Sequence, residues 1–246
     1  MTKTLIACGC SFTKDNYQKT WPDYLAQQLG YDLLNIGARG AGVDFIGKRL
    51  MMALNSIDPA NVLVGILLPS SDRFDLYVDQ LHVLKDDFLK ISSWQNGSNP
   101  HLVNLDGSFS SDHGYSLTGG ESRGYKKHWY MYYHNNTFAH INYWFNVINI
   151  QNFLKLKGFE YFFASAYDID NSTEQLTNIT DQPVEYDDMK SLVDFKNFVF
   201  HQDSRGFLSF VDEFGYEVNK NHPESTAHQQ FVTDVIVPFL KNKNLQ

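Results

Sequence analysis

The sequence predicts an open α/β fold in which a parallel sheet is covered by helices on both faces. Two observations support this prediction. Short apolar runs that suit buried strands alternate with segments whose apolar residues recur at helical spacing. The run at 62–68, Val-Leu-Val-Gly-Ile-Leu-Leu, is apolar throughout, as is typical of a central parallel strand buried on both faces. At 246 residues, the chain is long enough for one large α/β domain or for two small ones.

The first strand and the first helix have clear boundaries. Residues 4–8 are a short apolar run that ends at Gly9, which favours a buried strand over a helix. The segment 21–29 has apolar residues at helical spacing. It has Pro22 in its first turn and stops at Gly30, so a helix is predicted there.

The next three elements continue the alternation. A second strand is predicted at 31–36, and a second helix at 43–54, where the apolar residues lie near one face. The third strand spans 61–68. Strand, helix, strand, helix and strand in this order imply right-handed crossovers and a doubly wound sheet.

The alternation breaks at 71–136, which is rich in Ser, Gly, Asp and aromatic residues. This stretch is too long for a simple loop, so it predicts an inserted cap after the third strand. Further elements are expected at 137–157 (helix), 159–164 (strand), 189–200 (helix) and 226–240 (helix). We interpret residues 1–246 as a single domain, a three-layer α/β/α flavodoxin-like sandwich with a parallel sheet and an inserted cap.

Composition narrows the choice of partners. The formal net charge of −8 argues against non-specific nucleic-acid binding, which needs a basic face. No apolar stretch of about 18 residues is present, so no membrane span is expected. The first residues reach Gly9 too soon for a signal peptide, which predicts a cytoplasmic protein or one otherwise without a secretion signal. The only two cysteines, Cys8 and Cys10, lie too close in sequence for an ordinary disulfide, so we expect a reducing compartment. No second pair of cysteines is present, so we expect no metal. The oligomeric state stays open.

Three loops follow the carboxyl ends of the predicted strands, where ligands bind in open α/β sheets. The first, 9–13, places Ser11 in a glycine turn where its hydroxyl and backbone N–H groups can face a ligand. The second, 35–42, is glycine-rich but lacks the Gly-x-Gly-x-x-Gly pattern of a dinucleotide site. The third, 69–73, is Pro-Ser-Ser-Asp-Arg. Each loop taken alone is also compatible with a structural turn.

Taken in order, these segments resemble the SGNH/GDSL hydrolase family. Residues 9–12, Gly-Cys-Ser-Phe, look like its block I with Cys10 in place of the usual Asp. Residues 35–37, Asn-Ile-Gly, look like block II. Residues 219–223, Asn-Lys-Asn-His-Pro, which precede the last predicted helix, look like block V. The resemblance covers both ends of the chain and the first three strands, but not the region 71–136.

The resemblance implies a serine esterase that needs no cofactor. In that reading Ser11 attacks an ester carbonyl, and His222 takes its proton and later protonates the leaving alcohol. The N–H groups of Ser11 and Gly37 would stabilise the oxyanion. The substrate would be a carbohydrate ester or another small ester, for instance an acetylated sugar. Several aromatic residues of the cap suit a sugar ring or, equally, the cap's own small core: Trp94, Trp129, Tyr130, Tyr132 and Tyr133.

The sequence departs from the family pattern at two places. Asn219 occupies the position of the triad aspartate, and an Asn in that role lowers turnover about 10⁴-fold in serine proteases. The block III asparagine is missing, and the candidates in its place are Ser70, Ser71 and Arg73. A hydroxyl could donate to the oxyanion, Arg73 could bind a charged substrate, or the serines could cap a helix. These departures support an alternative: a catalytically weakened carbohydrate-binding or structural protein that retains the fold.

Two further questions about His222 stay open. Asp212, Glu217 or Glu224 could supply the missing carboxylate, or a backbone carbonyl could orient the ring in a dyad. His228 is an alternative base, but its place in the last predicted helix favours a structural role on the helix face.

Overall fold

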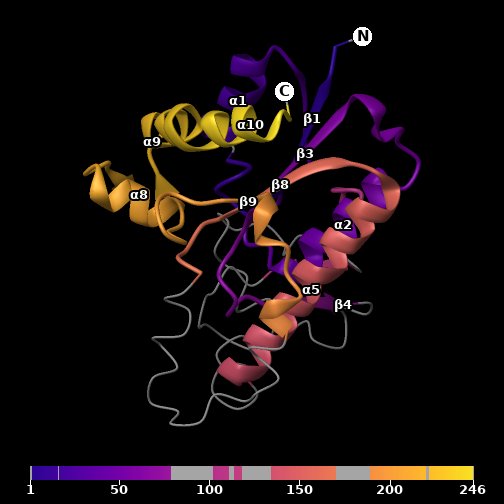
Figure 1. The fold of residues 1–246 in the computed structure, drawn as a ribbon. Coiled ribbons are helices and arrows are strands. Elements are labelled where there is room, and N and C mark those ends of the chain that lie inside the picture. The colour runs from indigo at the N-terminus through magenta and orange to yellow at the C-terminus, as the bar shows by residue number, and fades with distance from the viewer. Residues whose placement is uncertain are drawn as a thin grey trace.

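The computed structural model describes residues 2–15, 17–78, 102–110, 114–117, 134–169, 189–219 and 222–245. Its centre is a parallel five-stranded sheet of order β2-β1-β3-β8-β9 (Figure 1). The strands are β1 (Thr4–Gly9), β2 (Asp32–Asn35), β3 (Val62–Leu68), β8 (Glu160–Ser165) and β9 (Phe198–Val199). This is the flavodoxin order 2-1-3-4-5, so the predicted α/β/α sandwich is confirmed.

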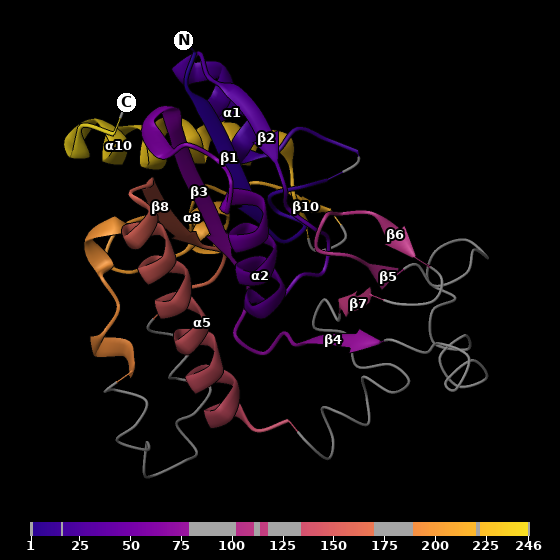
Figure 2. The same cartoon turned by 90° about the vertical axis from the view of Figure 1, so that its right-hand side faces the viewer.

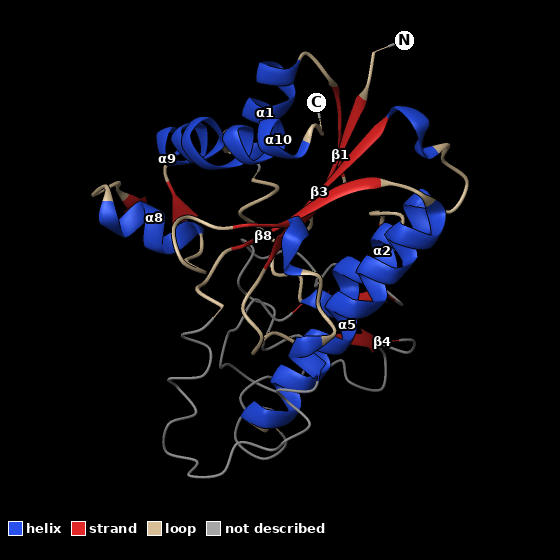
Figure 3. Cartoon of the chain, in the orientation of Figure 1, coloured by secondary structure: helices blue, strands red, loops and turns tan. Residues whose placement is uncertain are grey.

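Helices cover both faces of this sheet (Figures 1 and 3). One face carries α1 (Trp21–Leu29), α8 (Phe207–Glu213) and a last helix made of α9 (Ser225–Phe231), a π-helical segment (Val232–Ile236) and α10 (Val237–Lys243). The other carries α2 (Val43–Leu54) and α5 (Asn136–Lys157). Short 3-10 turns lie at Pro59–Asn61 and Phe195–Asn197.

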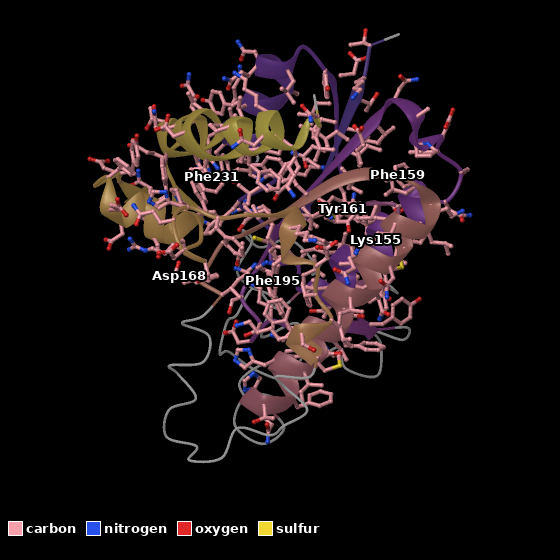
Figure 4. All side chains as sticks on the ribbon, in the orientation of Figure 1. Lys155, Phe159, Tyr161, Asp168, Phe195 and Phe231 are labelled. Atoms are coloured by element: carbon pink, nitrogen blue, oxygen red, sulfur yellow. The ribbon has the colours of Figure 1, made fainter. Side chains whose placement is uncertain are left out.

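Strand alternation explains the two cores. Leu5 and Ala7 of β1 join the core beneath α1 and α9, whereas Ile6 and Cys8 join the core beneath α2 and α5. Figure 4 shows Phe231 on the α9 side of the sheet and Tyr161 and Phe195 on the α5 side. Each face of a continuous apolar strand therefore has a helical layer to pack against.

Local sequence sets the helix ends where they were predicted. The Thr20 N–H donates to the Asp23 carboxylate at 2.9 Å at the start of α1, and Gly30 ends that helix with a left-handed φ of 68°. Asn135 accepts from the Phe138 N–H at 3.1 Å at the start of α5, and Gly158, with φ of 79°, ends it.

The described part of the predicted cap contains an antiparallel sheet of order β4-β7-β5-β6 (Figure 2). The strands are β4 (Asp75–Val78), β5 (Leu102–Val103), β6 (Phe109–Ser110) and β7 (Gly114–Leu117). Tyr115 of β7 packs edge-on against Phe45 of α2, with ring centroids 5.2 Å apart. The cap aromatics Trp94, Trp129, Tyr130, Tyr132 and Tyr133 lie outside the described residues. The single-domain interpretation stays a prediction.

One predicted helix needs correction, and one helix was not expected. The helix expected at 189–200 is wrong, because residues 195–197 form a 3-10 turn and Phe198–Val199 form β9, where the Phe198 ring stacks on Phe163 at 4.9 Å. Helix α8 was not predicted. Gly9, with φ of 156°, turns the chain at the end of β1, so the free cysteines Cys8 and Cys10 lie in opposite cores. Within the described ranges, no helix has the length and apolarity needed to cross a membrane.

Candidate active site

The turn after β1 holds Ser11 on a tightly constrained backbone. The N–H groups of Thr13 and Lys14 both donate to the carbonyl of Cys10, at 3.0 and 3.1 Å. At Gly9 a Cβ would clash with the Thr13 hydroxyl and lie 2.7 Å from the carbonyl oxygen of Leu67, so only glycine fits. Ser11 itself is only 7% exposed. This serine is therefore a near-buried residue on a rigid turn at the carboxyl end of β1.

A short hairpin before α9 carries His222. Strands β10 (Val218–Asn219) and β11 (His222–Pro223) pair antiparallel, with Asn219 directly opposite His222. Directly opposed residues in an antiparallel pair project their side chains to the same face, with Cβ atoms about 5 Å apart. The hairpin therefore puts the side chains of residues 219 and 222 on the same face, with residue 219 on an exposed strand.

The fold brings the Ser11 turn and the His222 hairpin together. The ring of Phe12, the residue after Ser11, meets the His222 ring edge-on, with centroids 5.6 Å apart and an interplanar angle of 86°. Gln18 Nε2 donates to the Pro223 carbonyl at 2.8 Å, across 205 positions of sequence. The Ser225 hydroxyl donates to the carbonyl of Lys19 and also bonds the Tyr24 hydroxyl, both at 2.8 Å. These bonds and ring contacts fix the position of one segment relative to the other.

The second histidine of this region, His228, is a core residue. It is 1% exposed, and its ring lies 4.7 Å from that of Phe207. Burial, and next the nearby His222, lower the pKa of His228 to about 3. His228 thus stays neutral throughout the ordinary pH range and lies inside a core, which supports the structural role expected for it.

Two of the acidic residues considered as partners of His222, Asp212 and Glu217, lie at exposed positions.

The glycine loop after β2 is bound to the Ser11 turn. The Asn35 amide donates to the Thr13 carbonyl at 2.7 Å, and the Ala38 N–H donates to the Gly9 carbonyl at 2.9 Å. The Gly37 N–H donates to the Asn35 side chain at 3.0 Å, so in this arrangement it is already engaged. Gly40, partly exposed and with a left-handed φ of 78°, is the next glycine along this loop. Asn35 is a positioning residue whose contacts with this turn were not predicted.

The loop after β3 places Arg73 beside the Ser11 turn. Arg73 Nη1 donates to the Ala41 carbonyl at 3.4 Å. Burial lowers the pKa of Arg73, but interactions with Cys10, Tyr167 and Asp72 outweigh it and the net shift is upward. The guanidinium interacts with the side chains of Cys10 and Tyr167. It therefore lies where the loops after β1, β2, β3 and β8 meet.

A shallow pocket opens beside Arg73, with about 380 Å³ of empty space when the open solvent at its mouth is included. Ser71, Asp72 and Arg73 line one side, and the other side is formed by Val43 and the region 134–143 at the start of α5. Ser70 does not line it, and its hydroxyl donates to the Asp72 carboxylate. Of the three candidates for the missing asparagine, the structure thus places Ser71 and Arg73 at a pocket.

No protein-family model matches the sequence, and neither does any curated protein. Solved structures do match it. TesA superposes with a TM-score of 0.50 at 13% identity, covering 98% of this chain and 99% of that one. The chain has the fold of TesA.

Two further solved structures align over nearly the whole chain. A putative GDSL-like lipase from Parabacteroides merdae is 12% identical, with a TM-score of 0.47, over 100% of this chain and 98% of that one. A catalytic mutant of Axe2, an acetylxylan esterase from Geobacillus stearothermophilus, is 12% identical, with a TM-score of 0.42, over 97% and 93%. Since the TesA match extends over both chains, it accounts for the whole α/β sandwich rather than for a fragment.

Proposed function

We propose that the protein is a serine ester hydrolase of the SGNH/GDSL kind, with Ser11 as the nucleophile and His222 as the base. The observation that carries the proposal is the convergence of the two segments. Phe12 lies against the His222 ring, and Gln18 bonds the Pro223 carbonyl. A serine on a strand-end turn and a histidine before the last helix are the two groups that acyl transfer requires. The TesA fold supports the same assignment.

The proposed reaction follows from these groups. Ser11 Oγ attacks the ester carbonyl while His222 takes the hydroxyl proton. The tetrahedral intermediate collapses to an acyl-serine, and His222 returns the proton to the departing alcohol. Water then attacks the acyl-serine with His222 again as the base, which regenerates Ser11 and releases the acid. The Ser11 N–H is one oxyanion donor in this proposal, and the glycine loop after β2 supplies the other.

Two glycines of that loop could supply the second donor. Gly37 can do so only by giving up its bond to Asn35, whereas Gly40 lies at the partly exposed end of the loop. For the substrate we propose a small-molecule or carbohydrate ester. The pocket beside Arg73 supports this, since it mixes apolar and hydrogen-bonding walls: Val43, Phe74 and Phe138 with Ser71, Asn135 and Asn142.

A second candidate is a non-catalytic carbohydrate-binding or structural protein. The observation that favours it is Asn219, which lies opposite His222 where a carboxylate would orient and stabilise the imidazolium. Such a protein would keep the pocket and the fold but would neither form an acyl-serine nor turn over esters.

The two candidates are separated by treating the protein with p-nitrophenyl acetate and with a serine-directed phosphonate. A hydrolase releases nitrophenol, and the phosphonate modifies the peptide that contains Ser11. Ser11→Ala must lose both reactions, whereas Ser56→Ala, which removes an exposed hydroxyl after α2, must keep them. Absence of turnover and of labelling in the natural sequence would favour the binding protein instead.

A further inference from the structure

We propose that Arg73 forms a subsite for a carboxylate of the substrate, so that the molecule whose ester is cleaved at Ser11 is itself an anion. This inference rests on the proposed ester hydrolysis and adds a class of substrate to it. Arg73 lines the pocket after β3, and its charge interacts with Cys10, the residue before Ser11. The proposed subsite is therefore next to the turn that carries the nucleophile.

The Arg73 guanidinium has more N–H donors than the described residues use. An arginine side chain carries five N–H donors and a permanent charge. Among the described residues it donates to the Ala41 carbonyl at 3.4 Å and interacts with the side chains of Cys10 and Tyr167, none of which is a carboxylate. No carboxylate in the described ranges forms an ion pair with Arg73 within 4.0 Å.

Two acids lie near Arg73. Asp72 lines the same pocket and interacts electrostatically with Arg73, but it is exposed and accepts from Ser70. Asp75 accepts from the N–H groups of Gly42 and Phe45, both at 2.9 Å, and caps α2. Burial raises the pKa of Asp75 to about 6, so it carries less than a full charge near neutral pH. Arg73 stays charged in the free protein, because its interactions raise its pKa on balance. A carboxylate ligand would supply the full counter-charge that no described residue places within 4.0 Å of the guanidinium.

The chemistry of the group favours a carboxylate as the ligand. The planar fork of a guanidinium matches a carboxylate through two parallel hydrogen bonds. Burial lowers the pKa of His134 and of His140 near the pocket, so neither adds a stable positive charge there. Arg73 is therefore the group that would select for charge. If it acted instead on the transition-state oxyanion, it would accelerate neutral and anionic esters alike, and this difference separates the two roles.

The test uses two pairs of esters that differ only in one carboxylate. The first pair is 4-acetoxybenzoate and its methyl ester, with the charge on the leaving group. The second is 4-nitrophenyl hemisuccinate and its methyl ester, with the charge on the acyl group. We expect kcat/KM of the natural sequence to favour the anionic member of at least one pair by roughly 10- to 100-fold, as charge-assisted hydrogen bonds allow. Arg73→Gln should remove this preference and leave the neutral esters little changed.

Two variants control for charge and folding. Arg39→Gln removes the same charge from an exposed side chain on the glycine loop and should keep the preference. Arg73→Lys keeps the charge without the fork and should keep part of it, which covers the case in which Arg73→Gln fails to fold. No preference in either pair, or an equal loss for neutral and anionic esters in Arg73→Gln, would overturn the subsite while leaving ester hydrolysis intact.

A binding measurement tests the carboxylate subsite at Arg73 independently of turnover. In Ser11→Ala, calorimetry should show 4-acetoxybenzoate binding more tightly than its methyl ester, and adding Arg73→Gln should abolish the difference. If the natural sequence cleaves no ester but this difference is present, the proposed hydrolysis fails and the anion subsite stands. Equal binding of the two compounds would contradict the proposed carboxylate subsite.

Discussion

Replacing the buried histidine His228 should change how the stability of the protein depends on pH. Its imidazole lies in the core beside Phe207, and Nδ1 has no hydrogen-bond partner among the described residues. Burial and His222 lower the pKa of His228 from 6.5 to about 3. Protonation is therefore disfavoured in the folded state but not in the unfolded chain.

The direction and size of this pH dependence follow from the linkage between protonation and folding. A histidine whose pKa falls on folding contributes stability that is present above about pH 6.5 and is lost as the pH falls toward about 3. For these two pKa values, the free energy of unfolding should fall by about 2 kcal/mol between about pH 8 and about pH 5 through His228 alone.

The assay is urea unfolding of the natural sequence and of His228→Leu across that pH range. The difference between the two proteins isolates His228, because other titrating groups are common to both. His228→Gln is a second variant that cannot titrate, and it should show the same pH slope as His228→Leu despite a different offset. Parallel pH curves for all three proteins would refute the assignment of His228 as a neutral core residue.

Three other substitutions test the site and the fold. Asn219→Asp places a carboxylate opposite His222 and should raise kcat for p-nitrophenyl acetate by about 10-fold or more, because a charged partner stabilises the imidazolium; a slower enzyme would show that position 219 does not face the ring. Asp75→Asn removes a carboxyl whose pKa is raised to about 6. The stability that Asp75 contributes is present below about pH 3.8 and is lost as the pH rises through about 6. The free energy of unfolding of Asp75→Asn should therefore rise by about 1 kcal/mol relative to that of the natural sequence between about pH 5 and about pH 8. A difference that stays constant over this range would contradict the raised pKa. Gly65→Ala puts a Cβ 2.7 Å from Phe162 and 2.8 Å from Trp21 in the central strand and should lower the free energy of unfolding by about 1–3 kcal/mol in urea titrations; an unchanged midpoint would mean that these rings move aside freely.

The fold was predictable where one local signal decided each element. Helix α1 begins beside Pro22 and ends at Gly30, and β3 is apolar throughout, so their bounds could be read from the chain. Strand β9 was missed because Phe198–Val199 is only two residues long and exists through its pairing with β8. A sequence pattern cannot show a partner strand that lies more than thirty positions away.

In the candidate site, too, some features could be predicted from local sequence and others depend on contacts between distant segments. The motif order pointed to Ser11 and His222, and the fold explains how the segments that carry them come together. The engagement of the Gly37 N–H by Asn35 depends on how the loop after β2 folds back, and no pattern of residue types shows that. Likewise, the position of Arg73 beside Cys10 results from contacts between four loops. The roles assigned to Gly37, Ser70, Ser71 and Asn219 stay predictions.

The pairing of Ser11 with His222 is tested most directly by trapping the acyl-serine. The protein is mixed with p-nitrophenyl acetate, quenched in acid, and analysed by peptide mass spectrometry. We predict an acetyl group on Ser11, none in Ser11→Ala, and a much slower appearance in His222→Gln. Acetylation at another residue, or acetylation of Ser11 at an unchanged rate in His222→Gln, would contradict the claim that this serine and this histidine act as a pair.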